Sequence, residues 1–187
     1  MGRIVVTEYV SIDGVAEAPS GTETFERVGW TDAFNRGLEG DQFKLDETMN
    51  ADALLLGRVT YDTFAPVWPH FEGEFADKFN TMPKHVVSHT LTNPEWNNTT
   101  VLSGDVIEEV AKLKQQYDRD IVVHGSLQLV QTLIEHDLVD VLNLQVYPVI
   151  VGAGKRMISE TSATKRFKLA EANTYGDVQF LVFQRAG

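Results

Sequence analysis

Three short segments join glycine to hydroxyl or charged residues where an apolar run gives way to a helical pattern. They are 57–60 (Gly-Arg-Val-Thr), 103–105 (Ser-Gly-Asp) and 124–126 (His-Gly-Ser). Such junctions suit phosphate, because the start of a helix offers free backbone N–H groups and glycine lets the backbone approach the ligand. Arg58 and Thr60 would add a positive charge and a hydroxyl group. A single glycine at such a junction more often serves only to let the strand and helix pack closely. Three junctions in one chain make a nucleotide-binding site as good an explanation as packing.

The elements that must position these junctions alternate along the chain. Strands are expected at 4–10, 53–56, 85–88, 99–102, 120–124 and 139–147, helices at 41–50, 57–66, 74–81, 106–116 and 127–136, and a closing hairpin at 167–175 and 178–184. This order predicts an α/β fold with a mainly parallel sheet, flanked by helices on both faces, and a C-terminal antiparallel hairpin. Ligands of such sheets bind at the carboxyl ends of the strands, so the three junctions are expected to meet there.

One long loop, from about residue 15 to residue 29, interrupts this alternation. A loop of this length inside a compact domain is usually functional or mobile. The 187 residues contain no linker and no internal repeat, so a single domain spanning 1–187 is expected.

Composition excludes several classes of chemistry. The chain has no cysteine, which removes disulfides, thiol nucleophiles and iron–sulfur clusters, and its five histidines lack metal-ligand spacing, so no metal site is expected. The net charge of −11 argues against broad nucleic-acid binding and against anionic membrane surfaces. No apolar run approaches the ~20 residues needed to span a bilayer, and no signal-peptide pattern opens the chain, so a cytoplasmic location is expected.

Five segments of the sequence carry a resemblance to a known family. They are 11–15 (SIDGV), 51–61 (ADALLLGRVTY), 82–88 (MPKHVVS), 120–126 (DIVVHGS) and 138–155, which ends in PVIVGAGK. The chain resembles the dihydrofolate-reductase-like superfamily. More closely, it resembles stand-alone relatives of the reductase domain of bacterial riboflavin biosynthesis, the RibD C-terminal domain family.

The resemblance implies a dihydrofolate-reductase-like fold that binds NADPH, often as a homodimer. It implies that Gly57, Arg58 and Thr60 hold the cofactor phosphates, with Ser88 and His89 near the adenosine 2′-phosphate. It further implies that Gly125, Ser126, Leu127 and Gln128 surround the pyrophosphate, and that Ile150 and Gly152 form part of the nicotinamide wall. Gly104, at the remaining junction, is a further candidate for cofactor binding.

The sequence also departs from the family pattern. Ser126-Leu127 stands where relatives commonly have small residues, and 61–64 (Tyr-Asp-Thr-Phe) replaces the Asp-Asp-Pro stretch of the riboflavin reductases. Asp41 stands about where dihydrofolate reductases place a helix carboxylate, but without their Leu-Pro-Trp lead-in.

Reduction of a C=N or C=O group needs a proton besides the hydride of the nicotinamide. Asp13 and Asp41 are the predicted proton relays, although Asp13 also fits a turn residue and Asp41 a first-turn helix acid. Stacking of a flat heterocycle, or simple core packing, is expected of the aromatic residues Trp30, Tyr61, Phe64, Trp68 and Tyr147. Gln145 is expected either to bond a substrate amide or to face solvent.

These features predict an NADPH-dependent reductase of a small heterocycle. Its expected substrates resemble those of dihydrofolate reductase or of 5-amino-6-(5-phosphoribosylamino)uracil reductase. Two alternatives stay open: a non-catalytic nucleotide-binding or sensor protein of the same fold, and a flavin or deazaflavin binder on another fold.

Overall fold

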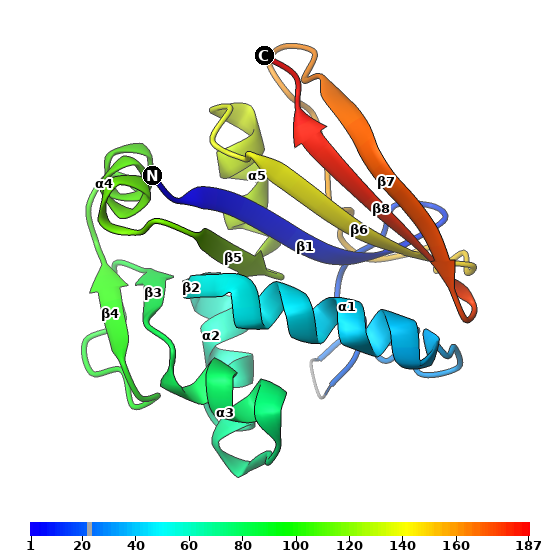
Figure 1. Ribbon diagram of the computed structural model, residues 1–187, viewed down its shortest axis with the longest axis horizontal. Helices are drawn as coiled ribbons and strands as arrows, with labels where there is room; N and C mark the ends of the chain where they lie inside the picture. Colours follow the sequence, from blue (N-terminus) through cyan, green and yellow to red (C-terminus); the bar gives the residue numbers. More distant parts are fainter. Residues whose placement is uncertain (22–23) are drawn as a thin grey trace.

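A single mixed sheet forms the centre of the computed structural model, which describes residues 1–21 and 24–187. Its eight strands lie in the order β4-β3-β2-β5-β1-β6-β8-β7, with the β7–β8 hairpin at one end (Figure 1). The strands are β1 (Arg3–Ser11), β2 (Ala51–Gly57), β3 (Lys84–Val87), β4 (Thr99–Leu102), β5 (Asp120–His124), β6 (Val141–Tyr147), β7 (Phe167–Tyr175) and β8 (Val178–Arg185). All pairings from β4 to β6 are parallel, whereas β8 is antiparallel to both β6 and β7.

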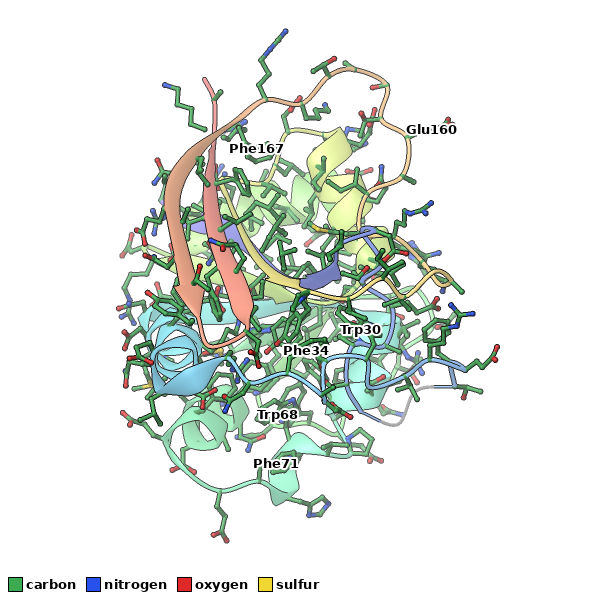
Figure 2. The ribbon with its side chains drawn as sticks, turned by 90° about the vertical axis from the view of Figure 1, so that its right-hand side faces the viewer. Trp30, Phe34, Trp68, Phe71, Glu160 and Phe167 are labelled. Atoms are coloured by element: carbon green, nitrogen blue, oxygen red, sulfur yellow. The ribbon has the colours of Figure 1, made fainter. Side chains whose placement is uncertain are left out.

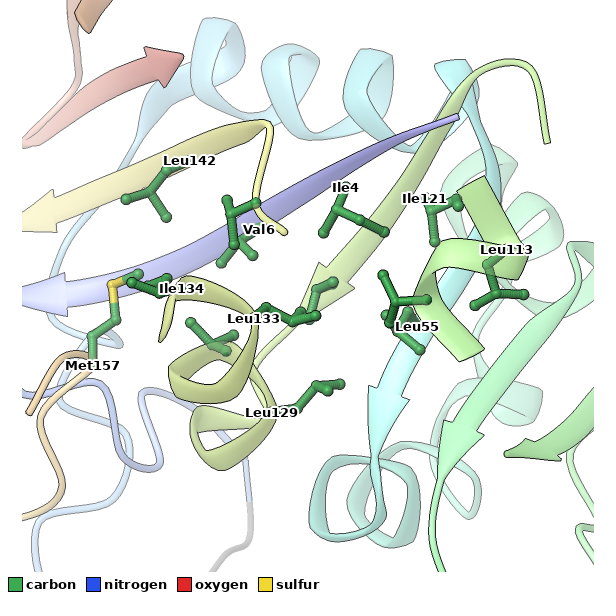
Figure 3. Packing of buried hydrophobic residues seen from close by; sticks show 14 of the residues in the cluster. Ile4, Val6, Leu55, Leu113, Ile121, Leu129, Leu133, Ile134, Leu142 and Met157 are labelled. Atoms are coloured by element: carbon green, nitrogen blue, oxygen red, sulfur yellow. The ribbon is translucent and has the colours of Figure 1, made fainter. Parts of the chain in front are cut away.

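Helices cover both faces of this sheet. They are α1 (Gly37–Asn50), α2 (Arg58–Phe64), α3 (Glu74–Thr81), α4 (Val106–Gln116), α5 (Leu127–Glu135) and the short 3-10 helix η1 (Trp68–His70). Side chains of a strand alternate between its two faces, and β1 shows this directly. Ile4 and Val6 pack with Leu133 of α5 (Figure 3), whereas Val5 packs in the cluster that contains Phe79 of α3. The predicted two-sided α/β sheet is therefore confirmed.

Several element boundaries differ from those expected. Helix α1 begins at Gly37 rather than at Asp41, because the Asn35 side chain accepts a hydrogen bond from the Gly37 N–H (2.7 Å) and starts the turn. β2 begins at Ala51 rather than at Ala53. Residues 22–23 of the predicted loop lie outside the described residues, and the rest of that loop contains one isolated bridge, from Val15 to Arg156.

The tip of the β7–β8 hairpin supports the start of α1. Asp177 donates its N–H to the Asn35 carbonyl (2.7 Å) and accepts the Asn35 N–H on its carboxylate (2.9 Å). Gly176, at a φ of 55°, approaches the same residue so closely that a Cβ would collide with the Asn35 carbonyl. The hairpin therefore fixes the backbone just before Arg36.

None of the helices in the described ranges is long and apolar enough to cross a membrane.

Candidate functional site

Two of the three predicted junctions lie side by side, because β2 and β5 are neighbours in the sheet. The Gly57 N–H donates to the Ser126 hydroxyl at 2.7 Å. A Cβ on Gly57 would lie 3.1 Å from the Ser126 Cβ, and a Cβ on Gly125 would lie 3.1 Å from Thr60 Oγ1. The β2–α2 and β5–α5 turns therefore interlock, and a Cβ at either glycine would force the neighbouring side chain to shift.

The helix starts at these two turns have no side-chain caps. Ser126 precedes α5 in the left-handed conformation (φ 64°, ψ 50°), and its hydroxyl bonds Gly57 instead of the amides of its own helix. No side chain caps α2 either. Uncapped amides at the start of a helix suit an anion. Leu127 is half-buried in this first turn and Gln128 is exposed.

Arg58 extends from the first turn toward the segment that follows β3. Its guanidinium pairs with Asp62 (2.8 Å) and donates to the Thr90 hydroxyl (3.2 Å). The buried Ser88 hydroxyl accepts the Thr90 N–H at 3.2 Å, and His89 between them is exposed. The structure thus brings Arg58, Ser88 and His89 to the same part of this edge.

The third junction stays apart. Gly104 follows the edge strand β4, which β3 separates from β2. The Asp105 carboxylate already accepts the N–H groups of Ile107 (3.0 Å) and Glu108 (3.1 Å) at the start of α4. The structure therefore does not bring Gly104 to the two interlocked turns, and the amides beside it are occupied.

A pocket of about 370 Å³ opens on the α1 side of the sheet, at the carboxyl ends of β1 and β6. Its lining includes Tyr9, Phe34, Arg36, Asp41 and Tyr147. The Tyr147 ring lies 5.5 Å from that of Tyr9 and 6.0 Å from that of Phe34, measured between centroids. The walls of this pocket are thus partly aromatic and partly charged, as a heterocycle site requires.

Arg36 organises the polar side of this pocket. Its Nε donates to Asp41 Oδ1 at 2.6 Å and its Nη1 donates to the Tyr9 hydroxyl at 2.7 Å. The predicted acid Asp41 therefore lines the pocket as the ion-pair partner of Arg36.

The Asp13 carboxylate is hydrogen-bonded to the loop that follows β6. It accepts hydrogen bonds from the Ser11 hydroxyl (2.6 Å) and from the N–H groups of Val151 (3.0 Å) and Gly152 (2.8 Å). The Ser11 bond above all, together with these two amides, lowers the pKa of Asp13 to about 2, with desolvation opposing in part. An ionised, fully bonded carboxylate argues against the predicted proton relay at this residue. The contacts instead tie the loop that carries Gly152 and the exposed Ile150 to the end of β1.

The predicted stacking residues divide between two places. Trp30 joins the pocket group, with its ring 5.7 Å from that of Tyr147. Tyr61, Phe64 and Trp68 instead pack with Phe79 beneath α2 and α3, and Figure 2 shows Trp68 well below Trp30 and Phe34. The Tyr61 hydroxyl is used there as well, because it accepts the Glu95 N–H at 2.9 Å. Of the five, Tyr147 lines the pocket and Trp30 packs against Tyr147.

Several polar side chains are buried on the same face, between α1 and the sheet. Gln145 is fully buried opposite Tyr9 of β1, and neither atom of its amide has a partner among the described residues. Lys44 of α1 donates to Thr7 (2.7 Å) and pairs with Glu47, whose carboxylate accepts from Asn143 (2.7 Å). The predicted exposed alternative for Gln145 is therefore wrong.

Two titratable groups near the β5–α5 junction have shifted pKa values. His124, which packs edge-on against Phe79, has a pKa well below its ordinary value because of burial and the nearby Lys44 charge. Glu8 lies on strand β1, and burial raises its pKa to about 8, with Lys44 opposing in part. Sequence reasoning missed Glu8, Tyr9 and Arg36. The sequence does contain one signal for two of them: Glu8 and Tyr9 are a charged and an aromatic residue within the otherwise apolar strand β1.

A second hollow, of about 460 Å³, lies at the end of α5. Its lining is polar and already paired internally, since Gln131 bonds the Glu160 carbonyl (2.8 Å) and Glu135 accepts the Ser162 N–H (3.2 Å). It holds none of the predicted residues, so the pocket beside Arg36 is the better candidate site.

Several known proteins are similar to this chain in sequence or in fold. Two proteins of Bacillus subtilis named as uncharacterized are similar: YyaP, 26% identical and covering 92% of this chain and 89% of its own length, and YwjB, 25% identical and covering 98% of each. A putative riboflavin biosynthesis protein from Shewanella sp. PV-4 has the same fold, with a TM-score of 0.79, 16% identity and 99% of each chain covered.

Two further structures share the fold at greater distance. A pyrimidine reductase-like protein from Corynebacterium diphtheriae gives a TM-score of 0.67 at 13% identity, covering 100% of this chain and 92% of that one. Dihydrofolate reductase from Enterococcus faecalis, solved with NADP(H), gives 0.61 at 15% identity, covering 100% and 98%. The predicted dihydrofolate-reductase-like fold is therefore confirmed, and a flavin binder on another fold is excluded.

A family model described as the RibD C-terminal domain matches residues 3–181, almost the whole chain. The chain therefore belongs to the RibD C-terminal domain family.

Proposed function

We propose that this protein is an NADPH-dependent reductase of a small heterocycle, such as a pteridine or an aminouracil riboside phosphate. The interlocking of the Gly57 and Gly125 turns carries the proposal. It leaves two uncapped helix starts next to each other at the carboxyl edge of a parallel sheet. That arrangement offers several backbone N–H groups to a pyrophosphate.

The residues at this edge fit the cofactor. The amides of Leu127 and Gln128 and the β2–α2 turn would hold the pyrophosphate, with Arg58 as the positive charge. The Arg58 contact with Thr90, beside the buried Ser88, supports a place for a further phosphate near Ser88 and His89. Arginine is well suited to this role because its planar guanidinium binds two phosphate oxygens at once.

The pocket lined by Tyr9, Arg36, Asp41 and Tyr147 would hold the substrate. NADPH, when bound, supplies a hydride. The chain's own residues would stack the heterocycle on the aromatic wall, exclude water and supply the proton. Trp30 extends that wall, while the buried amide of Gln145 lies behind it.

A titration with NADPH, followed by nicotinamide fluorescence and by thermal shift, tests the cofactor. We expect saturable binding below millimolar concentration, and no binding at millimolar NADPH would overturn the proposal. Loss of NADPH absorbance on adding a dihydropterin or an aminouracil riboside phosphate tests the reaction. Cofactor binding without turnover on either compound would instead identify a nucleotide-binding or sensor protein.

The family resemblance also supports a homodimer. Strand β7 forms one edge of the sheet, where backbone N–H and C=O groups face outward and could pair with a second copy. Light scattering coupled to size exclusion is expected to give twice the mass of the 187-residue chain, and a monomer at all concentrations would exclude the dimer.

A further inference from the structure

We infer that Tyr9 is the proton donor of the proposed reduction and that Arg36 positions its hydroxyl. The inference rests on the proposed function and deepens it, because it assigns the proton that neither predicted carboxylate is placed to give.

Tyr9 lies between the proposed cofactor turns and the pocket. In the sheet, Thr7 of β1 pairs with His124, the last residue of β5. Tyr9 is two residues further along β1, beside the Gly125 turn, and ordinary strand spacing and rise put the two backbones roughly 6 Å apart. Its side chain lies on the α1 face and lines the pocket. A substrate in this pocket would therefore meet Tyr9 at the side that faces the cofactor edge.

The hydrogen bonding of the Tyr9 hydroxyl leaves its proton free for a ligand. A phenol has one hydrogen to donate and oxygen lone pairs that accept. Arg36 Nη1 donates to this oxygen at 2.7 Å, so the phenolic hydrogen points away from the guanidinium. Within the described part of the chain, the Tyr9 hydroxyl donates to no protein acceptor. A ligand bound in the pocket could therefore accept this proton.

The other acids of this region are poorer donors. Asp13 is ionised and bonded to its loop, and Asp41 is the carboxylate of an ion pair with Arg36. Tyr147 shares the pocket, but burial and the neighbouring Tyr9 raise its pKa, with Arg36 opposing in part, so its phenol releases a proton less readily. Arg36 Nη1 donates to the Tyr9 oxygen at 2.7 Å, and that charged donor would still be bonded to the oxygen after proton transfer.

The proton and electron balance is simple. The hydride brings one hydrogen and two electrons to the carbon of a C=N or C=O bond, and NADPH leaves as NADP⁺. The O–H bond of Tyr9 breaks as its proton moves to the nitrogen or oxygen of the same double bond. Arg36 offsets the charge of the phenolate, which regains a proton from water entering the pocket.

Paired substitutions of the two pocket tyrosines test this assignment. The variants are Tyr9→Phe and the matched Tyr147→Phe, each removing one hydroxyl from the same pocket. The probes are NADPH, oxidised pterin as a non-reacting ligand, and a dihydropterin or an aminouracil riboside phosphate for turnover. We expect Tyr9→Phe to lower kcat by about 10²–10⁴-fold, the usual contribution of a general acid, and Tyr147→Phe to lower it less than about tenfold.

Binding gives a readout that is independent of turnover. Tyr9→Phe should weaken pterin binding to the cofactor-free protein by roughly 2–10-fold, the loss of one hydrogen bond, while the Kd for NADPH stays unchanged. Arg36→Met should lower kcat in the wild-type background and should have no further effect in Tyr9→Phe, because it acts through that hydroxyl. If the Arg36→Met variant folds poorly, comparison of Tyr9→Phe with the double variant still tests whether Arg36 acts through the Tyr9 hydroxyl.

The outcomes separate the inference from the proposed function. Wild-type turnover that survives Tyr9→Phe, or that falls equally in both tyrosine variants, would overturn the role of Tyr9 and leave the reductase standing. A wild-type protein that binds NADPH but reduces neither compound would remove the reductase and the inference together.

Discussion

Gly57 and Ser126 are joined by a hydrogen bond of 2.7 Å from backbone N–H to side-chain hydroxyl, although 69 residues separate them in the chain. The bond ties the start of α2 to the start of α5. This hydroxyl adds to the β2–β5 pairing and to the Gly125–Thr60 contact in fixing the two turns relative to each other.

Removing that hydroxyl should weaken cofactor binding. Ser126→Ala leaves the partly buried Gly57 N–H without its partner, which costs about 1–3 kcal/mol of unfolding free energy, and it loosens the pair of turns. We expect a lower melting temperature and a several-fold higher Kd for NADPH. Ser103→Ala is the matched control, because Ser103 lies at the junction that stays apart, and it should change neither value. Equal effects of both substitutions would contradict the pairing of the turns.

Arg58→Ala should weaken NADPH binding far more than it changes stability. The exposed pair with Asp62 contributes little to stability, whereas a charged hydrogen bond to phosphate contributes about 1.5–3 kcal/mol, or roughly 10–100-fold in Kd. The effect should shrink at high salt. Arg119→Ala is the control, since Arg119 forms a similar ion pair with Asp52 next to β5's amino end. A similar loss of NADPH affinity in both variants would indicate that the net charge of the protein, and not a contact of Arg58 with phosphate, causes the effect.

Asp13→Asn should release the loop that carries Gly152. The amide side chain retains the shape of the carboxylate but has a single acceptor oxygen, whereas Val151 and Gly152 donate to different oxygens of Asp13, so one of the two N–H groups loses its partner. We expect faster hydrogen exchange at those two amides and a larger loss of turnover than of NADPH affinity. Unchanged exchange would show that the loop is held by other contacts, of which the Arg156 bond to the Asp13 carbonyl is one.

Glu8→Gln should alter the pH dependence of stability. Burial raises the pKa of Glu8 from 4.5 to about 8, so between these pH values the folded protein keeps a proton that the unfolded chain has lost. Rising pH through this range therefore destabilises the wild-type fold, by on the order of 3 kcal/mol. Glu8→Gln lacks this titration. Urea unfolding at pH 5 and pH 8 should show the variant gaining on the wild type as pH rises, and parallel pH dependence would refute the shift.

Local sequence signals were enough for the fold and for the two interlocked turns. Glycine next to Arg58, and glycine next to Ser126, mark turns whose conformation is set within a few residues. The sequence could not reveal that Gly104 would stay apart, because strand order is a property of the whole sheet and β3 comes between.

The pocket was harder to predict for the same reason. Trp30 and Trp68 are equally good stacking residues in a sequence, but one packs near Tyr147 and the other on Phe79. Arg36 and Tyr9 meet only because α1 starts at Gly37 and crosses the sheet at the end of β1. Neither residue carries a local motif, so their pairing becomes visible only in three dimensions.

Because Gly176 lies so close to Asn35, the length of the terminal hairpin sets the position of the segment that leads to the pocket. An additional residue at the hairpin tip would displace the segment before Arg36 away from the hairpin. A deletion there would remove the support of this segment and let it move toward the hairpin. Relatives with a longer or shorter final hairpin should therefore accept ligands of different size, even where every residue that lines the pocket is the same.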